Sequence, residues 1–202
     1  MRDDNNAQGT ATCSPLLRPF LGERHMQPLA KQTLSAKIGA VNSPAGKSRC
    51  KVAFFPGCMG DKIFTNVSEA CLKVFDYHEV GVYLPTNYSC CGIPALSSGD
   101  LEGFEKMVMH NVDVLKEGSF DLIVTPCSSC TETIRSLWPK MAGKMPYKYR
   151  DAINELSQKA MDSTPSSWMC SVKPRASGRH GQTGDYHESC HLLRSLGVRR
   201  AP

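Results

Sequence analysis

The stretch that decides the fold reads Val52-Ala53-Phe54-Phe55-Pro56-Gly57-Cys58. Its four apolar residues are too few for a helix of ordinary length, and the Pro-Gly pair ends the run, so it predicts a short buried strand. Two similar runs follow, at residues 80–84 and 122–124, and each is also stopped by a proline. The sequence therefore predicts at least three buried strands of the same kind.

Helical patterns separate these strands. Apolar residues recur at helical spacing over residues 63–77 and 100–116, and further helices are predicted at 131–138 and 148–161. Strands that alternate with helices indicate an α/β fold, with a parallel sheet, right-handed crossovers and flanking helices. A fourth strand is predicted at residues 185–187.

Ten cysteines are present, and five of them lie just after predicted strands. The five are Cys58, Cys90, Cys91, Cys127 and Cys130. In open α/β sheets, ligands bind outside the carboxyl ends of the strands, because the loops that follow the strands gather there. We therefore expect the five thiols to converge at one edge of the sheet.

Converging thiolates repel one another unless a cation lies between them. Sites rich in thiolates select iron–sulfur clusters, zinc or copper(I). The adjacent Cys90 and Cys91 serve one centre only if it is larger than a single ion or if the loop bends, and Gly92 permits such a bend. Five thiolates also exceed the four ligands of tetrahedral zinc. The pattern favours a multi-iron cluster, with structural zinc or plain buried thiols as the alternatives.

Three motifs resemble those of the cysteine-rich CCG domain. They are Phe55-Pro56-Gly57-Cys58, Cys90-Cys91-Gly92-Ile93-Pro94 and Val124-Thr125-Pro126-Cys127-Ser128-Ser129-Cys130. This domain occurs in one of the subunits of heterodisulfide reductase and in the iron–sulfur subunits of glycolate oxidase, anaerobic glycerol-3-phosphate dehydrogenase and lactate-utilisation complexes. The resemblance covers roughly residues 51–140, and residues 95–100 look most like the lactate-utilisation branch.

The resemblance implies that the five cysteines hold a 4Fe-4S cluster, cubane or noncubane. The expected function is that of an iron–sulfur electron-transfer subunit in an oxidoreductase complex of the lactate/glycolate dehydrogenase or heterodisulfide reductase type. Its partners would be subunits that contain flavin or iron–sulfur clusters. The sequence has no flavin fingerprint or phosphate-binding glycine loop, so no catalytic residue is assigned. The alternative is a zinc-stabilised binding or assembly module without redox activity.

Four segments are predicted along the chain. Residues 1–49 form an extended or poorly ordered N-terminal arm, residues 50–162 the CCG domain, and residues 163–182 a linker rich in Ser, Pro and Gly. Residues 183–202 resemble the start of a second, truncated CCG repeat. There His187, Cys190 and His191 are better interpreted as a dangling tail or a partner-contacting segment than as part of a metal site, because the cysteines that would complete a site are absent.

Composition and charge bear on where the protein acts and which ligands it binds. Of the 202 residues 41% are hydrophobic, but no window approaches the ~18 uninterrupted apolar residues of a membrane span. The N-terminus lacks a secretory signal, so we expect a cytoplasmic protein whose membrane association, if any, passes through a partner. The net charge of +5 is not gathered into a basic stripe with interleaved aromatic residues, which argues against nucleic acid as a ligand.

Overall fold

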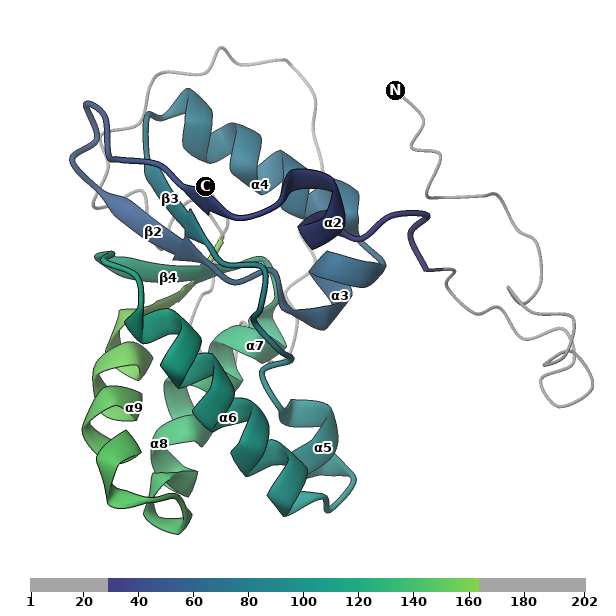
Figure 1. The fold of residues 1–202 in the computed structure, drawn as a ribbon, viewed down its shortest axis with the longest axis vertical. Coiled ribbons are helices and arrows are strands. Elements are labelled where there is room, and N and C mark those ends of the chain that lie inside the picture. Colours follow the sequence, from purple (N-terminus) through teal and green to yellow (C-terminus); the bar gives the residue numbers. More distant parts are fainter. Residues whose placement is uncertain (1–28, 164–202) are drawn as a thin grey trace, which may run out of the picture.

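The computed structural model describes residues 29–163. They form an α/β fold around a five-stranded sheet with the strand order β1-β3-β2-β4-β5 (Figure 1). The strands are β1 (Val41–Asn42), β2 (Lys51–Phe54), β3 (Gly81–Leu84), β4 (Leu122–Thr125) and β5 (Ala160–Asp162). The last four pair in parallel, and β1 runs antiparallel to β3. The predicted fold class is confirmed.

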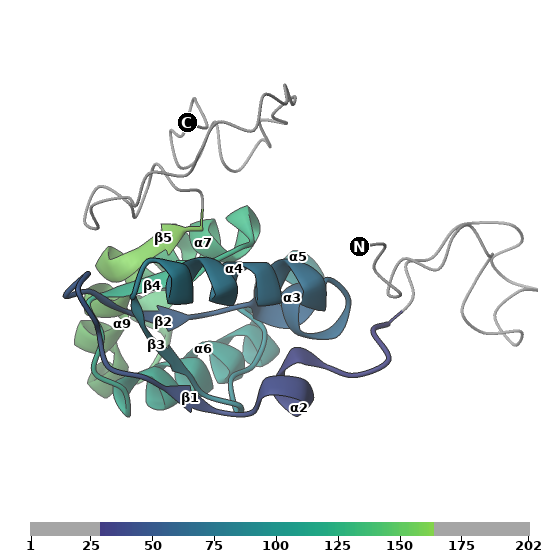
Figure 2. The same ribbon diagram turned by 90° about the horizontal axis from the view of Figure 1, so that it is seen from above.

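Helices cover both faces of the sheet (Figures 1 and 2). They are α2 (Leu34–Ile38), α3 (Gly57–Lys62), α4 (Thr65–Tyr77), α5 (Ile93–Ser97), α6 (Leu101–Lys116), α7 (Ser128–Glu132), α8 (Trp138–Met141) and α9 (Tyr147–Lys159). A π-helical turn, η1 (Thr133–Leu137), joins α7 to α8, and a 3-10 turn, η2 (Ala142–Lys144), follows α8. No helix within residues 29–163 is long and apolar enough to cross a membrane.

The hydrophobic core has two halves, one on each face of the sheet. Ala53 and Phe55 point to the half that α6, α8 and α9 cover, whereas Val52 and Phe54 point to the half that α2 and α4 cover. Because both faces are buried, the strands are continuous apolar runs rather than alternating ones. This explains why the run at residues 52–55 has no polar member.

Most of the predicted elements lie where the sequence places them. The runs at 52–55, 80–84 and 122–124 contain β2, β3 and β4, and the helices predicted at 63–77 and 100–116 correspond to α4 and α6. The predicted strand at 185–187 lies outside the described residues.

Two segments differ from the prediction. The helix predicted at 148–161 ends at Lys159, and residues 160–162 form β5. Ala160 and Asp162 pair there with Ile123 and Thr125, so pairing with β4 outweighs the local helical pattern. The helix predicted at 131–138 is the middle of the longer run α7–η1–α8.

Part of the predicted N-terminal arm packs onto the domain. Helix α2 is capped by Thr33, whose hydroxyl accepts a hydrogen bond from the Ala36 N–H, and its Leu34 side chain is 0% exposed. The Ser35 N–H donates to the buried carboxylate of Asp61, at 2.9 Å. Residues 1–28 lie outside the described part of the chain.

Replacing Leu34 tests whether α2 belongs to the core. Leu34→Ala is expected to lower the free energy of unfolding by about 2–5 kcal/mol, because it removes a fully buried side chain. Urea denaturation measures the change. Leu29→Ala, at an exposed position just before α2, serves as the control and should change stability by no more than about 0.5 kcal/mol. Equal stabilities of the two variants would show that α2 does not pack on the domain in solution.

Candidate metal centre

Five cysteines from three loops meet at the carboxyl ends of the parallel strands. Cys58 begins α3 after β2, Cys90 and Cys91 follow β3, and Cys127 and Cys130 lie at the start of α7 after β4. Helices α3, α5 and α7 gather at this end of the sheet (Figure 1). The structure thus brings together the five residues that the sequence analysis singled out.

The five sulfur atoms form one continuous row. The Sγ atoms of Cys58 and Cys90 are 3.5 Å apart. Hydrogen bonds between thiols continue the row from Cys90 to Cys91, from Cys91 to Cys130 and from Cys130 to Cys127. Cys91 and Cys130 are buried in the core, whereas the other three thiols are partly exposed. The row therefore has a buried centre and two ends that reach the surface.

Two glycines allow this close approach. Gly57 has a φ of 68°, and a Cβ atom placed on it would lie 2.8 Å from the Sγ atom of Cys130. Gly92 has a φ of 97°, and a Cβ atom there would lie 2.6 Å from the Phe104 ring. A larger residue at either position meets both an unfavourable backbone conformation and a steric clash. Gly57 thus lets the first cysteine loop touch the third.

Backbone N–H groups surround the sulfur row. They belong to the first turns of α3, α5 and α7, where amides have no partner within the helix. The N–H of Met59 points to Cys58, that of Gly92 to Cys90, that of Ile93 to Cys91, and those of Ser129 and Cys130 to Cys127. Each of these hydrogen bonds lowers the pKa of the thiol that accepts it, because it stabilises the thiolate. The backbone at this site therefore stabilises the thiolate form of the cysteines.

Contacts between the thiols divide them into two kinds. Hydrogen bonds from Cys58 and Cys91 lower the pKa of Cys90 to about 2, and a hydrogen bond from Cys130 lowers that of Cys127 to about 6. The pKa values of Cys58 and Cys130 are raised, first by donating those bonds and then by burial. In each of these contacts the thiol that donates favours the thiolate form of the thiol that accepts. All five become thiolates together only when a cation compensates their charge.

The donor set fits an iron–sulfur cluster by its chemistry. Five soft sulfur donors lie in contact, and thiolates are the ligands that such clusters use. Between residues 29 and 163, no three His, Cys, Asp or Glu side chains surround a point where one metal ion would contact all of them. The thiols are joined pair by pair through hydrogen bonds, and metal binding would replace these hydrogen bonds with metal–sulfur bonds.

Two buried polar side chains hold the Cys90–Cys91 loop, and sequence analysis missed this role for both. Asn111, 0% exposed on α6, donates to the Cys90 carbonyl and accepts from the Ser89 N–H, both at 2.8 Å. The indole N–H of Trp138 donates to the Cys91 carbonyl at 3.0 Å. A signal for Asn111 was present, since it lies on the apolar stripe of the predicted helix at 100–116.

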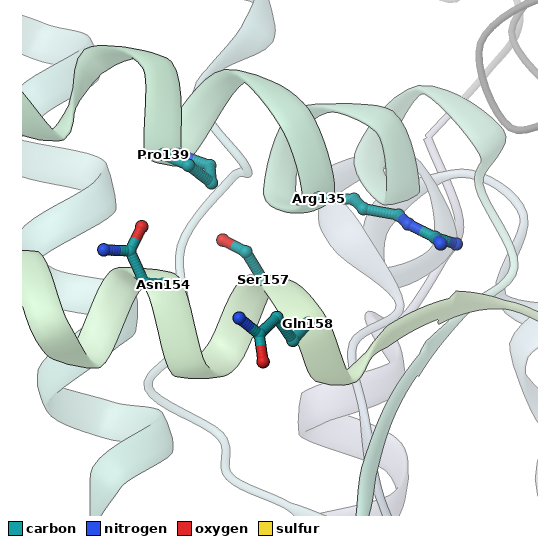
Figure 3. A pocket seen from close by; sticks show the side chains of 5 residues that line it. All are labelled: Arg135, Pro139, Asn154, Ser157 and Gln158. Carbon is teal, nitrogen blue, oxygen red and sulfur yellow. The ribbon is translucent and has the colours of Figure 1, made fainter.

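A polar hollow lies elsewhere on the described surface. It is lined by Arg135 and Pro139 from the η1–α8 run and by Asn154, Ser157 and Gln158 from α9 (Figure 3). The Ser157 hydroxyl donates to the Ile153 carbonyl within the same helix. None of the five cysteines lines this hollow, so it is separate from the sulfur row.

The comparison with known families concerns the part of the chain that contains the five cysteines. The family model for the cysteine-rich domain CCG matches residues 52–135, a range that contains all five cysteines. Residues 52–135 are a CCG cysteine-rich domain. The resemblance proposed from the three motifs is confirmed.

Three curated relatives illustrate the range of proteins to which the chain is similar. The chain is 29% identical to a subunit of the fumarate reductase (CoM/CoB) of Methanothermobacter marburgensis, over 81% of this chain and 30% of the relative. It is 26% identical to an uncharacterised iron–sulfur protein of Methanocaldococcus jannaschii, over 79% and 29%. It is 30% identical to the lactate utilization protein A of Bacillus cytotoxicus, over 75% and 62%. The chain thus spans less than two thirds of each relative, and no solved structure matches it significantly.

Removing the Asn111 amide tests whether its hydrogen bonds stabilise the Cys90–Cys91 loop. Asn111→Leu leaves the Ser89 N–H and the Cys90 carbonyl, both half-buried, without their Asn111 partner, at an expected cost of about 2–4 kcal/mol in unfolding free energy. Urea denaturation of the metal-free protein measures it. Asn154→Leu, at an exposed position of α9, is the matched control and is expected to stay within about 0.5 kcal/mol of the wild type. A cost for Asn111→Leu as small as that of the control would rule out the proposed support.

Proposed function

We propose that this chain is an iron–sulfur electron-transfer subunit of an oxidoreductase complex, with a 4Fe-4S cluster bound by Cys58, Cys90, Cys91, Cys127 and Cys130. The observation that carries the proposal is the continuous row of five sulfur atoms at the carboxyl ends of β2, β3 and β4. One relative is named an iron–sulfur protein and another is named a reductase subunit. The names of these relatives agree with the chemistry of the donor set.

The protein's own groups would shape the behaviour of this centre. A bound cluster supplies one-electron transfer. The thiolates would hold the cluster, and the backbone N–H groups of α3, α5 and α7 would offset their negative charge. This favours the reduced form of the cluster, which carries one more negative charge. The buried Cys91 and Cys130 keep water from the inner side. The partly exposed Cys58, Cys90 and Cys127 leave the outer side open to an electron-transfer partner.

The proposal extends to the partners and to the segments of the chain. Electrons would come from, or pass to, a subunit that contains flavin or iron–sulfur clusters, in a complex of the lactate/glycolate dehydrogenase or heterodisulfide reductase type. The names of two relatives, a fumarate reductase subunit and lactate utilization protein A, motivate this choice. Residues 50–162 would be the cluster-binding domain, and residues 183–202 would begin a second repeat.

Replacing a single cysteine tests the proposal. In anaerobically purified protein, Cys91→Ser is expected to lower bound iron and acid-labile sulfide and to change the visible absorption, because it removes the central sulfur of the row. Iron, sulfide and the absorption spectrum are measured side by side.

Cys71→Ser is the matched control, since Cys71 lies on α4 outside the sulfur row. It is expected to keep the iron, sulfide and spectrum of the wild type. Iron and spectrum unchanged in Cys91→Ser would refute the assignment of Cys91 as a ligand. Zinc in place of iron in the wild type would favour the structural module over the electron carrier.

A further inference from the structure

Helix α4 turns an apolar face outward. Val67 is 45% exposed and Val74 is 41% exposed on this face, and Tyr77 at the end of α4 is also exposed. Phe64, just before α4, and Met59, next to Cys58 in α3, are exposed as well. We call these five residues the apolar strip. At ~3.6 residues per turn, positions 67, 74 and 77 lie within about 80° of one another and share one side of α4, whereas the buried Phe75 lies on the neighbouring side.

The other two long helices of the described fold do not share this property. The exposed positions of α6 carry charged or polar side chains: Glu102, Lys106, His110, Asp113 and Lys116. Those of α9 after Tyr147 do likewise: Lys148, Asp151, Asn154, Glu155 and Gln158. A helix that faces water on its outer side normally has such a polar surface, and contiguous exposed apolar residues mark a contact surface. We therefore interpret the apolar strip as a surface that another polypeptide segment covers.

The chain leaves the described fold beside α4. The Ser163 N–H continues the β5 pairing by donating to the Thr125 carbonyl at 2.9 Å, and the Ser163 side chain hydrogen-bonds to Cys71 in the middle of α4. Figure 2 shows β5 next to α4 in the view from above. The residues that follow Ser163 thus start beside α4, at the level of Cys71.

Residues 164–202 have the length and the composition to cover the strip. Thirty-nine residues follow Ser163 (202 − 163), whereas the strip along α4 spans only ~20 Å at 1.5 Å per residue. They include the apolar residues Trp168, Met169, Leu192, Leu193 and Leu196. Because this segment is tethered beside α4, its effective concentration there is far above that of a separate molecule.

We propose that residues 164–202 of the same chain pack onto the apolar strip of α3 and α4. Residues 1–28 are the main competitor, and they join the fold at the other end of the strip, where the Ala30 N–H donates to the Lys62 carbonyl. The contact of Ser163 with Cys71 favours the C-terminal segment, because it starts at the centre of α4.

Site-specific photo-crosslinking tests the proposal in the full chain. The photoreactive residue p-benzoylphenylalanine replaces Val67, and dilute, anaerobically purified protein is irradiated and digested for peptide mapping. The expected product is an intramolecular crosslink to a peptide within residues 164–202. Crosslinks to residues 1–28 or to a second copy, or none above the control, overturn the proposal. The same probe at Val74 provides a second reading if the Val67 variant folds poorly.

The control places the probe at Tyr147, which is 75% exposed and begins α9 on the opposite face of the sheet. It should give no crosslink to residues 164–202. A further variant of the full chain combines Leu193→Asp and Leu196→Asp with the probe at Val67. This double substitution should remove most of the crosslinked product, because it replaces the apolar side chains that the strip would bury. A yield unchanged by the substitution would also overturn the proposal.

Discussion

The parallel pairing of β2 with both β3 and β4 is the constraint on which the site depends. Ala53 at the centre of β2 pairs with Tyr83 on one side and with Ile123 on the other, so the three strands end at the same edge of the sheet. A cysteine-bearing loop follows each strand there. A slip of one residue in either pairing would exchange the two faces of the strand and separate the loops. The core on both faces of the sheet thus fixes the place where the thiols meet.

A glycine and two side-chain hydrogen bonds then bring the thiols at this edge of the sheet into contact. Gly57 has no Cβ atom, and a Cβ atom there would keep the first cysteine loop away from Cys130. Asn111 and Trp138 hold the carbonyls of Cys90 and Cys91 against the helical layer, so these two neighbours join one row instead of diverging. Because the carbonyls of Cys90 and Cys91 have these partners, the loop does not bear the cost of leaving these two carbonyls unsatisfied.

The sequence predicts the framework well because its signals are local. The apolar runs of β2, β3 and β4 and the periodic stripes of α4 and α6 each appear within one short window, and the structure has them in place. Strand β5 escapes prediction because its three residues continue a helical pattern and depend on pairing with β4. The convergence of the cysteines follows from their position after the strands. The order of sulfur contacts and the hydrogen bonds of Asn111 depend on residues that lie far apart in the sequence, and no local pattern encodes them.

The metal content of the anaerobically purified full chain tests the central claim most directly. Iron, acid-labile sulfide and zinc are quantified per chain, together with the visible spectrum. The account predicts about four irons and four sulfides with little zinc, since five thiolates exceed what tetrahedral zinc takes. One zinc per chain with neither iron nor sulfide would contradict it and would identify the sulfur row as a structural zinc site.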